Sequence, residues 1–245
     1  MPVCRFDQNP QFTAITLSRV VAVGDPAIDR NAYPAFPSLP AAKAEAVAIG
    51  RQYTQSRTLT GRHATLRNLA TSVPTADVVH IAAHVVSGGN EGEPPKLLLA
   101  PSPQHAGACS VGDAAELPLK KGSVVLVPGC QTGSSSEPGT LKDFAGSFIA
   151  AGARSVVATL WEIEDDPSRT FALFFHRALC KRGSAVTALR EAQLAMLRSA
   201  NARLRDPRAW SAFQVYGVAQ DQSWMSSRTA PGAEDADLLR SRFVQ

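Results

Sequence analysis

Short, continuously apolar runs alternate along the chain with longer segments in which apolar residues recur at the spacing of a helix. The runs are rich in valine, and they cover residues 19–26, 77–86, 122–130 and 155–161. Strands that are apolar on both faces are typical of a parallel sheet buried between helices. Helices are predicted between and after these strands, at residues 41–53, 64–73, 141–153, 167–183 and 184–199. The alternation predicts an α/β fold with a mostly parallel central sheet and helices on both faces.

Shorter segments complete the predicted order of elements. They are strands at residues 56–61, 96–102 and 210–218, and a helical turn at residues 110–117. Ser110 and Ser184 are expected to be N-caps, because a serine hydroxyl can accept a bond from a free N–H group of the first helical turn. We expect a single domain over residues 1–218, followed by a polar tail over residues 219–245.

The composition limits the classes of function. The chain has 245 residues, 44% of them hydrophobic and 19% charged, which is ordinary for a folded protein. Its net charge is +4 and its arginines are scattered, so direct binding of nucleic acid is not expected. No segment resembles a signal peptide or is apolar over the thickness of a bilayer. We therefore expect a cytoplasmic protein that makes no contact with a membrane.

The four cysteines, at positions 4, 109, 130 and 180, form no C-x-x-C pair. They are expected to be thiols in a reducing compartment rather than a zinc site or a disulfide framework. Neither a metal ion nor a cofactor is expected. Cys109 and Cys180 lie in apolar segments and are predicted to be small core residues, as most buried cysteines are.

Two histidines lie four residues apart in the apolar segment VVHIAAHVV. If residues 77–86 form one strand, His80 and His84 lie on the same face but about 13 Å apart at roughly 3.3 Å per residue, too far to bind one metal ion. His80, in the middle of the strand, is predicted to be a core histidine. His84 lies near the carboxyl end of the strand. The histidines at positions 63, 105 and 176 are expected in loops or on helix surfaces.

Cys130 ends another apolar strand, immediately before the polar turn QTGSSSEPG. Ligands of parallel α/β sheets bind beyond the carboxyl ends of the strands. His84 and Cys130 are therefore predicted to face each other across adjacent strand ends. A neighbouring imidazole can take the proton of a thiol and later pass it to a leaving amine. This is the chemistry of a cysteine peptidase.

Five ordered blocks of the sequence resemble the CHAT family of clan CD cysteine peptidases, which are relatives of caspases and separases. The blocks are HIAAH, LLLAPS, VVLVPGCQTG, FAGSFIAAGARSVVATLWEIEDD and FFHRALCKRGSAVTALREAQLAM. The resemblance implies a caspase-like three-layer sandwich. It also implies that His84 and Cys130 are the catalytic residues, and that the backbone N–H groups of Val85 and Cys130 form the oxyanion hole.

The same resemblance implies a pocket for the substrate side chain. Separase-like relatives have an aspartate in a Trp-Asp-Val-Thr-Asp block that pairs with an arginine at P1. The segment WEIED places Trp161 and Asp165 at the matching positions, and Gln131 is the third candidate substrate-binding residue. The alternative for this acidic segment is that it opens the helix near Pro167, where negative charge suits the helix dipole.

We therefore predict a cysteine endopeptidase that cleaves a protein or peptide substrate, with a basic P1 residue, under the control of a sensor domain or partner protein. The alternative is a catalytically impaired CHAT-like scaffold that acts by protein binding. It depends on Val85, because the family usually has glycine directly after the catalytic histidine. A nucleotide-binding protein or an α/β-hydrolase is not supported, since the chain has no G-x-G-x-x-G, P-loop or G-x-S-x-G segment.

Overall fold

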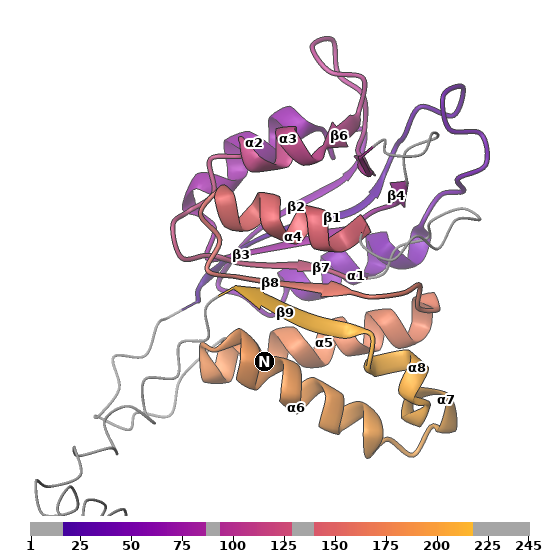
Figure 1. The fold of residues 1–245 in the computed structure, drawn as a ribbon, viewed down its shortest axis with the longest axis vertical. Helices are drawn as coiled ribbons and strands as arrows, with labels where there is room; N and C mark the ends of the chain where they lie inside the picture. The colour runs from indigo at the N-terminus through magenta and orange to yellow at the C-terminus, as the bar shows by residue number, and fades with distance from the viewer. Residues whose placement is uncertain (1–16, 87–93, 129–139, 218–245) are drawn as a thin grey trace, which may run out of the picture.

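A six-stranded sheet forms the centre of the molecule, with strand order β2-β1-β3-β7-β8-β9 (Figure 1). The computed structural model describes residues 17–86, 94–128 and 140–217. Strands β2, β1, β3, β7 and β8 are parallel, and β9 pairs with β8 in the antiparallel direction. The strands are β1 (Arg19–Pro26), β2 (Gln55–Gly61), β3 (Val78–Ala82), β7 (Val124–Val127), β8 (Ser155–Thr159) and β9 (Phe213–Gly217). The predicted mostly parallel sheet is confirmed.

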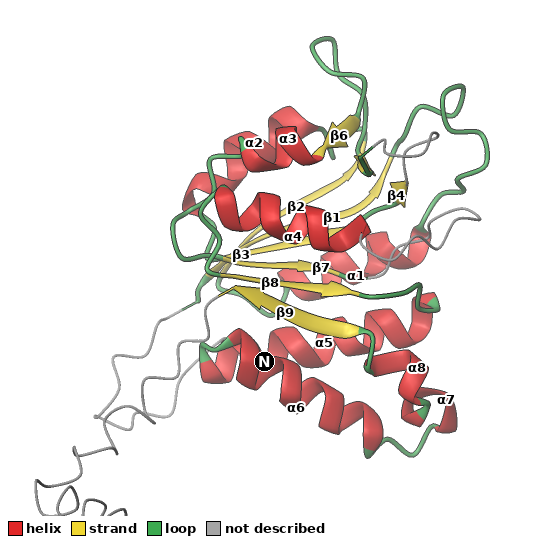
Figure 2. Ribbon diagram, in the orientation of Figure 1, coloured by secondary structure: helices red, strands yellow, loops and turns green. Residues whose placement is uncertain are grey.

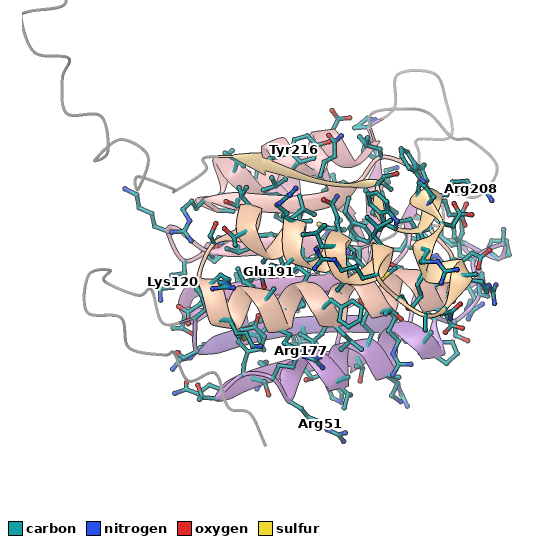
Figure 3. The ribbon with its side chains drawn as sticks, turned by 90° about the horizontal axis from the view of Figure 1, so that it is seen from below. Arg51, Lys120, Arg177, Glu191, Arg208 and Tyr216 are labelled. Atoms are coloured by element: carbon teal, nitrogen blue, oxygen red, sulfur yellow. The ribbon has the colours of Figure 1, made fainter. Side chains whose placement is uncertain are left out.

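Helices cover both faces of this sheet, so the molecule has three layers (Figure 2). One layer contains α2 (Leu66–Ser72), α3 (Val111–Ala115) and α4 (Thr140–Ala150). The other contains α1 (Pro40–Gly50), α5 (Asp165–Arg182) and α6 (Ala185–Leu197). Figure 3 looks onto the second layer, where Arg51 and Arg177 are exposed. The short helices are η1 (Val73–Thr75), α7 (Ala202–Arg205) and α8 (Pro207–Trp210).

The alternation of side chains along each strand builds two cores. Val20 and Val124 belong to the core under α1, α5 and α6, while Val21 and Val125 belong to the core under α2, α3 and α4. All residues of the central strands β3, β7 and β8 are buried because both faces of the sheet are covered there, which explains the continuous apolar runs in the sequence. The edge strand β2 is different, since four of its seven residues are exposed. His80, two residues after Val78, extends from the sheet toward the α1 and α5 layer.

The predicted strand over residues 77–86 is interrupted, and this is the main difference from the sequence prediction. Strand β3 ends at Ala82, and Val85–Val86 form the separate strand β4. Strand β4 pairs antiparallel with β5 (Lys96–Leu98), which pairs with β6 (Ala108–Ser110) in a small second sheet. His84 lies in the break between the two sheets. The prediction that both histidines lie on one continuous strand was therefore wrong.

The predicted helix ends agree with the structure. The hydroxyl of Ser110 accepts a bond from the N–H of Asp113, whose carboxylate in turn accepts from the N–H of Ser110, so that both form a capping box. The hydroxyl of Ser184 caps α6 in the same way. Helix α5 ends at Gly183, whose φ of 67° is a left-handed conformation that glycine adopts without strain.

Replacing Gly24 by alanine should move α1 away from β1. A Cβ atom on Gly24 would lie 2.3 Å from the carbonyl oxygen of Ala42, so the helix or the strand must shift. We expect the free energy of unfolding to fall by about 1–3 kcal/mol, the usual cost of overpacking. The matched control is Gly146→Ala in α4, where no atom lies within 4 Å of the new methyl group. Urea denaturation checks both, and equal stability of the two variants would contradict the close contact.

The described residues also bear on membrane-spanning helices and on the state of the cysteines. Among them, no helix has both the length and the apolar character needed to cross a membrane. Cys109 is a buried free thiol, as predicted, and burial raises its pKa to about 12. Cys180 is buried but disulfide-bonded, so the expectation of four thiols was wrong for this residue. The tail over residues 219–245 lies outside the described residues, and the domain boundary at residue 218 stays a prediction.

Candidate active site

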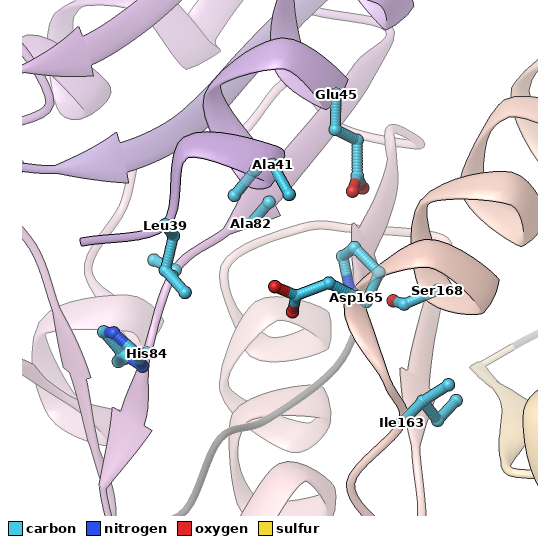
Figure 4. Close-up of a pocket in the computed structure, with 11 residues that line it drawn as sticks. Leu39, Ala41, Glu45, Ala82, His84, Ile163, Asp165 and Ser168 are labelled. Atoms are coloured by element: carbon cyan, nitrogen blue, oxygen red, sulfur yellow. The ribbon is translucent and has the colours of Figure 1, made fainter. Parts of the chain in front are cut away.

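A small pocket of about 40 Å³ opens beyond the carboxyl end of β3, between the start of α1 and the start of α5 (Figure 4). Its walls come from segments that are far apart in the sequence. The polar side chains that line it are those of Glu45, His84, Asp165 and Ser168. The position agrees with the general rule that parallel α/β sheets bind ligands at this edge.

His84 is held on one side of the pocket by the loop before α1. Its Nε2 lies 2.8 Å from the carbonyl oxygen of Pro37. Because a carbonyl oxygen can only accept, Nε2 carries the hydrogen and Nδ1 has the free lone pair of the neutral ring. Nδ1 is buried and has no hydrogen-bond partner within the part of the chain that the structure describes. The edge of the imidazole also packs on Phe36, with ring centroids 5.1 Å apart.

Asp25 anchors the loop that orients His84. It is the one non-glycine residue with positive φ among the described residues, at 49°. Aspartate tolerates this left-handed conformation better than most residues do. Its Oδ1 accepts a bond from the N–H of Leu39 at 2.6 Å, two residues after the Pro37 carbonyl. The end of β1 thus fixes the loop, and the loop fixes the imidazole.

The surroundings of His84 favour the neutral ring. Burial lowers its pKa below the usual 6.5, and the positive charge of Arg30 lowers it further. The bond to Pro37 and the negative charges of Asp165 and Asp25 oppose this shift. The net direction is downward, so the ring is uncharged at neutral pH and Nδ1 is able to accept a proton.

Val85 has an ordinary strand conformation, with no positive φ. It is opposite Leu97 in the antiparallel pair of β4 and β5, and the N–H of Leu98 donates to the carbonyl of His84 at 2.8 Å. That bond makes Val85 and Leu97 a non-hydrogen-bonded pair, in which the N–H of Val85 points away from β5. The valine side chain is buried in the core. Its backbone N–H is therefore not used by the small sheet.

Asp165 and Trp161 have different surroundings. Asp165 is the first residue of α5, is exposed, and lines the pocket opposite His84. Trp161 does not line the pocket, and its indole N–H donates instead to the carbonyl of Arg208 at 3.1 Å. The buried side chain of Ile163, between them in the sequence, lines the pocket. The structure thus brings Asp165 to His84, whereas Trp161 lies against α8.

Cys130 and Gln131 lie outside the described residues. The strand before them is described, and β7 pairs directly with β3, as the prediction of adjacent strand ends requires. Pro128, at the end of β7, lines the same pocket as His84. The described chain therefore reaches this pocket two residues before Cys130 in the sequence.

His80 belongs to a buried polar chain behind the pocket. Its Nε2 lies 3.0 Å from Oε1 of Glu45, and its Nδ1 lies 3.2 Å from Nε2 of His176. Nδ1 of His176 lies 2.7 Å from the hydroxyl of Tyr53. Burial, and then the neighbouring His80, hold the pKa of His176 well below its usual value, while burial raises the pKa of Tyr53. The prediction that His176 is a surface residue was wrong, because it is fully buried.

Sequence reasoning missed Glu45 and the orienting carbonyl of Pro37. A signal for Glu45 existed, because it lies four residues before Ile49 and therefore on the apolar stripe of its helix. A carboxylate on a buried helix face is uncommon and points to a partner. Pro37 gave no such signal, since any residue has a carbonyl group.

The fold and this site define a class of protein, the caspase-like cysteine peptidase fold. Among solved structures, the chain is similar to the Arg-specific cysteine proteinase gingipain R (RgpB), with a TM-score of 0.52 and 13% identity over 84% of this chain and 48% of that chain. It is similar to the complex of Porphyromonas gingivalis RgpB pro- and mature domains, with a TM-score of 0.50 and 11% identity over 83% of this chain and 47% of that chain. The chain thus spans about half the length of these gingipain chains.

The family model of the CHAT domain matches residues 4–218, so the chain belongs to the CHAT domain family. The resemblance found in the sequence is confirmed, and so is the caspase-like three-layer sandwich. A further similar structure is the Saccharomyces cerevisiae separase–securin complex, with a TM-score of 0.49 and 13% identity over 86% of this chain and 13% of that chain. A search of curated proteins gave no match.

Proposed function

We propose that this chain is a cysteine endopeptidase with His84 as general base and Cys130 as nucleophile. The observation that carries the proposal is the state of His84. Its Nε2 donates to Pro37, its Nδ1 is free among the described groups, and the residue lines the same pocket as Pro128, which directly follows β7. Such a base, oriented by a third group, is the arrangement that activates a nucleophile.

The reaction follows from these roles. Nδ1 of His84 takes the proton of the Cys130 thiol, and the thiolate attacks the carbonyl carbon of the peptide bond. The backbone N–H groups of Val85 and Cys130 donate to the resulting oxyanion, which stabilises the tetrahedral intermediate. The imidazolium then gives its proton to the leaving amine, and a thioester remains on the sulfur. Water, deprotonated by His84, hydrolyses the thioester and releases the acid and the free thiol.

Asp165 supports a preference for a basic residue at P1. Its carboxylate is on the wall of the pocket that His84 also lines. The similar gingipain R is described as Arg-specific. We assign Gln131 a contact with the substrate backbone next to the nucleophile. Trp161 directly precedes the acidic residues 162–166 and does not line the pocket, so we assign it a contact with the substrate outside the pocket.

We further propose that a sensor domain or partner protein controls the peptidase. The similar RgpB structure is a complex of pro- and mature domains, so a relative of this fold binds a protein segment. The match covers only about half of each gingipain chain, so proteins with this fold can have further domains that could regulate the peptidase.

Thiol labelling combined with a positional peptide library tests the proposed function. The wild-type chain should react with iodoacetamide at Cys130 and cleave peptides with Arg or Lys at P1, and Cys130→Ala should lose both properties. The matched control is Cys109→Ala, because that thiol is buried and its pKa of about 12 keeps it protonated and unreactive. Full cleavage by Cys130→Ala would refute the nucleophile. An unreactive thiol in a folded chain without cleavage would instead support the scaffold.

A further inference from the structure

Glu45 is a buried carboxylate on the wall of the pocket that the proposed reaction does not use. Its side chain comes from the middle of α1, and the residue is 4% exposed. It lines the pocket together with His84 and Asp165, and Figure 4 shows its carboxylate directed into the space between α1 and α5. Glutamate is almost never fully buried unless it is paired, and the basic neighbour of Glu45 among the described residues is His80, on the side away from the pocket opening.

The polar chain behind Glu45 holds its carboxylate without satisfying it. Oε1 of Glu45 lies 3.0 Å from Nε2 of His80, yet the two atoms are not aligned as a hydrogen bond. Neither atom has another hydrogen-bond partner in the described ranges of the chain. His80 is itself fixed by His176, which is fixed by Tyr53. The carboxylate is therefore held in position with capacity to accept bonds from a group in the pocket.

Asp165 supplies a second carboxylate from the facing wall. It lines both the pocket and an outer groove that contains Glu162 and Asp166. The charge of Glu164 is offset by Arg203, whose guanidinium nitrogen lies 2.8 Å from its carboxylate. No lysine or arginine is among the described residues that line the pocket or this groove. Apart from His80 behind Glu45, the described lining thus presents two carboxylates without a basic side chain between them.

We propose that Glu45 is a specificity-determining residue that binds, together with Asp165, the guanidinium group of a substrate arginine. The identity of this group as a P1 side chain rests on the proposed peptidase function. A guanidinium is planar and has five N–H donors on separate edges, so it can bond to two carboxylates at once. The ammonium of lysine is a compact charge without this fixed geometry. The two carboxylates therefore select arginine over lysine.

Binding of benzamidine, whose amidinium resembles a guanidinium, tests this proposal without catalysis. Calorimetry on the full chain with Cys130→Ala should show that Glu45→Gln, which keeps the shape of the side chain, weakens binding by at least about tenfold. Two matched controls remove the same charge elsewhere. Glu162→Gln at the outer groove should weaken binding by less than about threefold, and Glu191→Gln on α6 (Figure 3) should leave it unchanged. A loss for Glu45→Gln no larger than that for Glu162→Gln would overturn the proposal.

Cleavage assays separate this inference from the proposed function. A chain that cuts no peptide but binds benzamidine through Glu45 refutes the peptidase and supports the pocket. A chain that cuts peptides with the same Arg-to-Lys preference in Glu45→Gln overturns the role of Glu45 and leaves the peptidase intact. If Glu45→Gln does not fold, a crystal structure of the wild-type chain soaked with benzamidine decides. An amidinium nitrogen within hydrogen-bond distance of Glu45 supports the proposal, and an amidinium on Asp165 alone contradicts it.

Discussion

Replacing His84 by alanine is expected to lower kcat/KM for peptide hydrolysis by about 10²–10⁴-fold, the usual contribution of a general base. The physical reason is that the buried Nδ1 of His84 is the acceptor for the thiol proton, and alanine leaves the nucleophile protonated. The measurement is a progress curve on a fluorogenic peptide with arginine at P1. His105→Ala is the control, because this partly exposed histidine lies in the loop before β6 and bonds to the N–H of Gly107.

The acid limb of the pH profile gives a second readout of the same role. The base must be neutral to accept a proton, and burial lowers the pKa of His84 below its usual 6.5. Activity should therefore persist below pH 6.5 and decline only as the pH approaches this lowered pKa. A folded His84→Ala variant with wild-type kcat/KM would remove His84 from the mechanism.

The order of strands and helices could be predicted because the central parallel strands are buried on both faces. Segments such as residues 20–23 and 156–158 are apolar at every position, and no helix-spaced pattern competes with them. The break at Ala82 could not be predicted, since Val85 and Val86 are as apolar as the residues of β3. What ends β3 is the pairing of β4 with β5, a contact between separate segments of the chain. The local sequence pattern around residue 82 contains no information on this pairing with a separate segment.

Some residues of the candidate site could likewise be predicted from the sequence, whereas others could be found only in the fold. His84 was identified near the carboxyl end of a predicted strand, and Asp165 by the resemblance of WEIED to a block of separase-like relatives. The orientation of His84 depends on the carbonyl of Pro37, a residue 47 positions earlier, and this could come only from the fold. His176 was misjudged for the same reason. Its helix has aromatic residues on several sides, and only packing on β3 decides which side is buried.

Replacing His80 by alanine is expected to lower the free energy of unfolding by about 3–5 kcal/mol, the range found when one partner of a buried polar pair is removed. His80 is fully buried, and its loss leaves Glu45 without its 3.0 Å neighbour and His176 without its 3.2 Å neighbour. Domains are stable by only about 5–15 kcal/mol, so this variant should unfold at much lower urea concentration. His63→Ala, at an exposed turn, is the control and should change stability by less than about 0.5 kcal/mol.

A double-mutant cycle distinguishes lost pairing from lost packing. If His80 acts through Glu45, the cost of His80→Ala should shrink once Glu45→Ala has removed the stranded carboxylate, with a coupling energy of about 0.5–3 kcal/mol. Additive costs would mean that the histidine only fills space, and Glu45 would then lack the support that holds it in the pocket. The two histidines of one short segment should thus separate cleanly. His84→Ala should lose hydrolysis and keep its fold, whereas His80→Ala should lose stability because it lies behind the pocket and not in it.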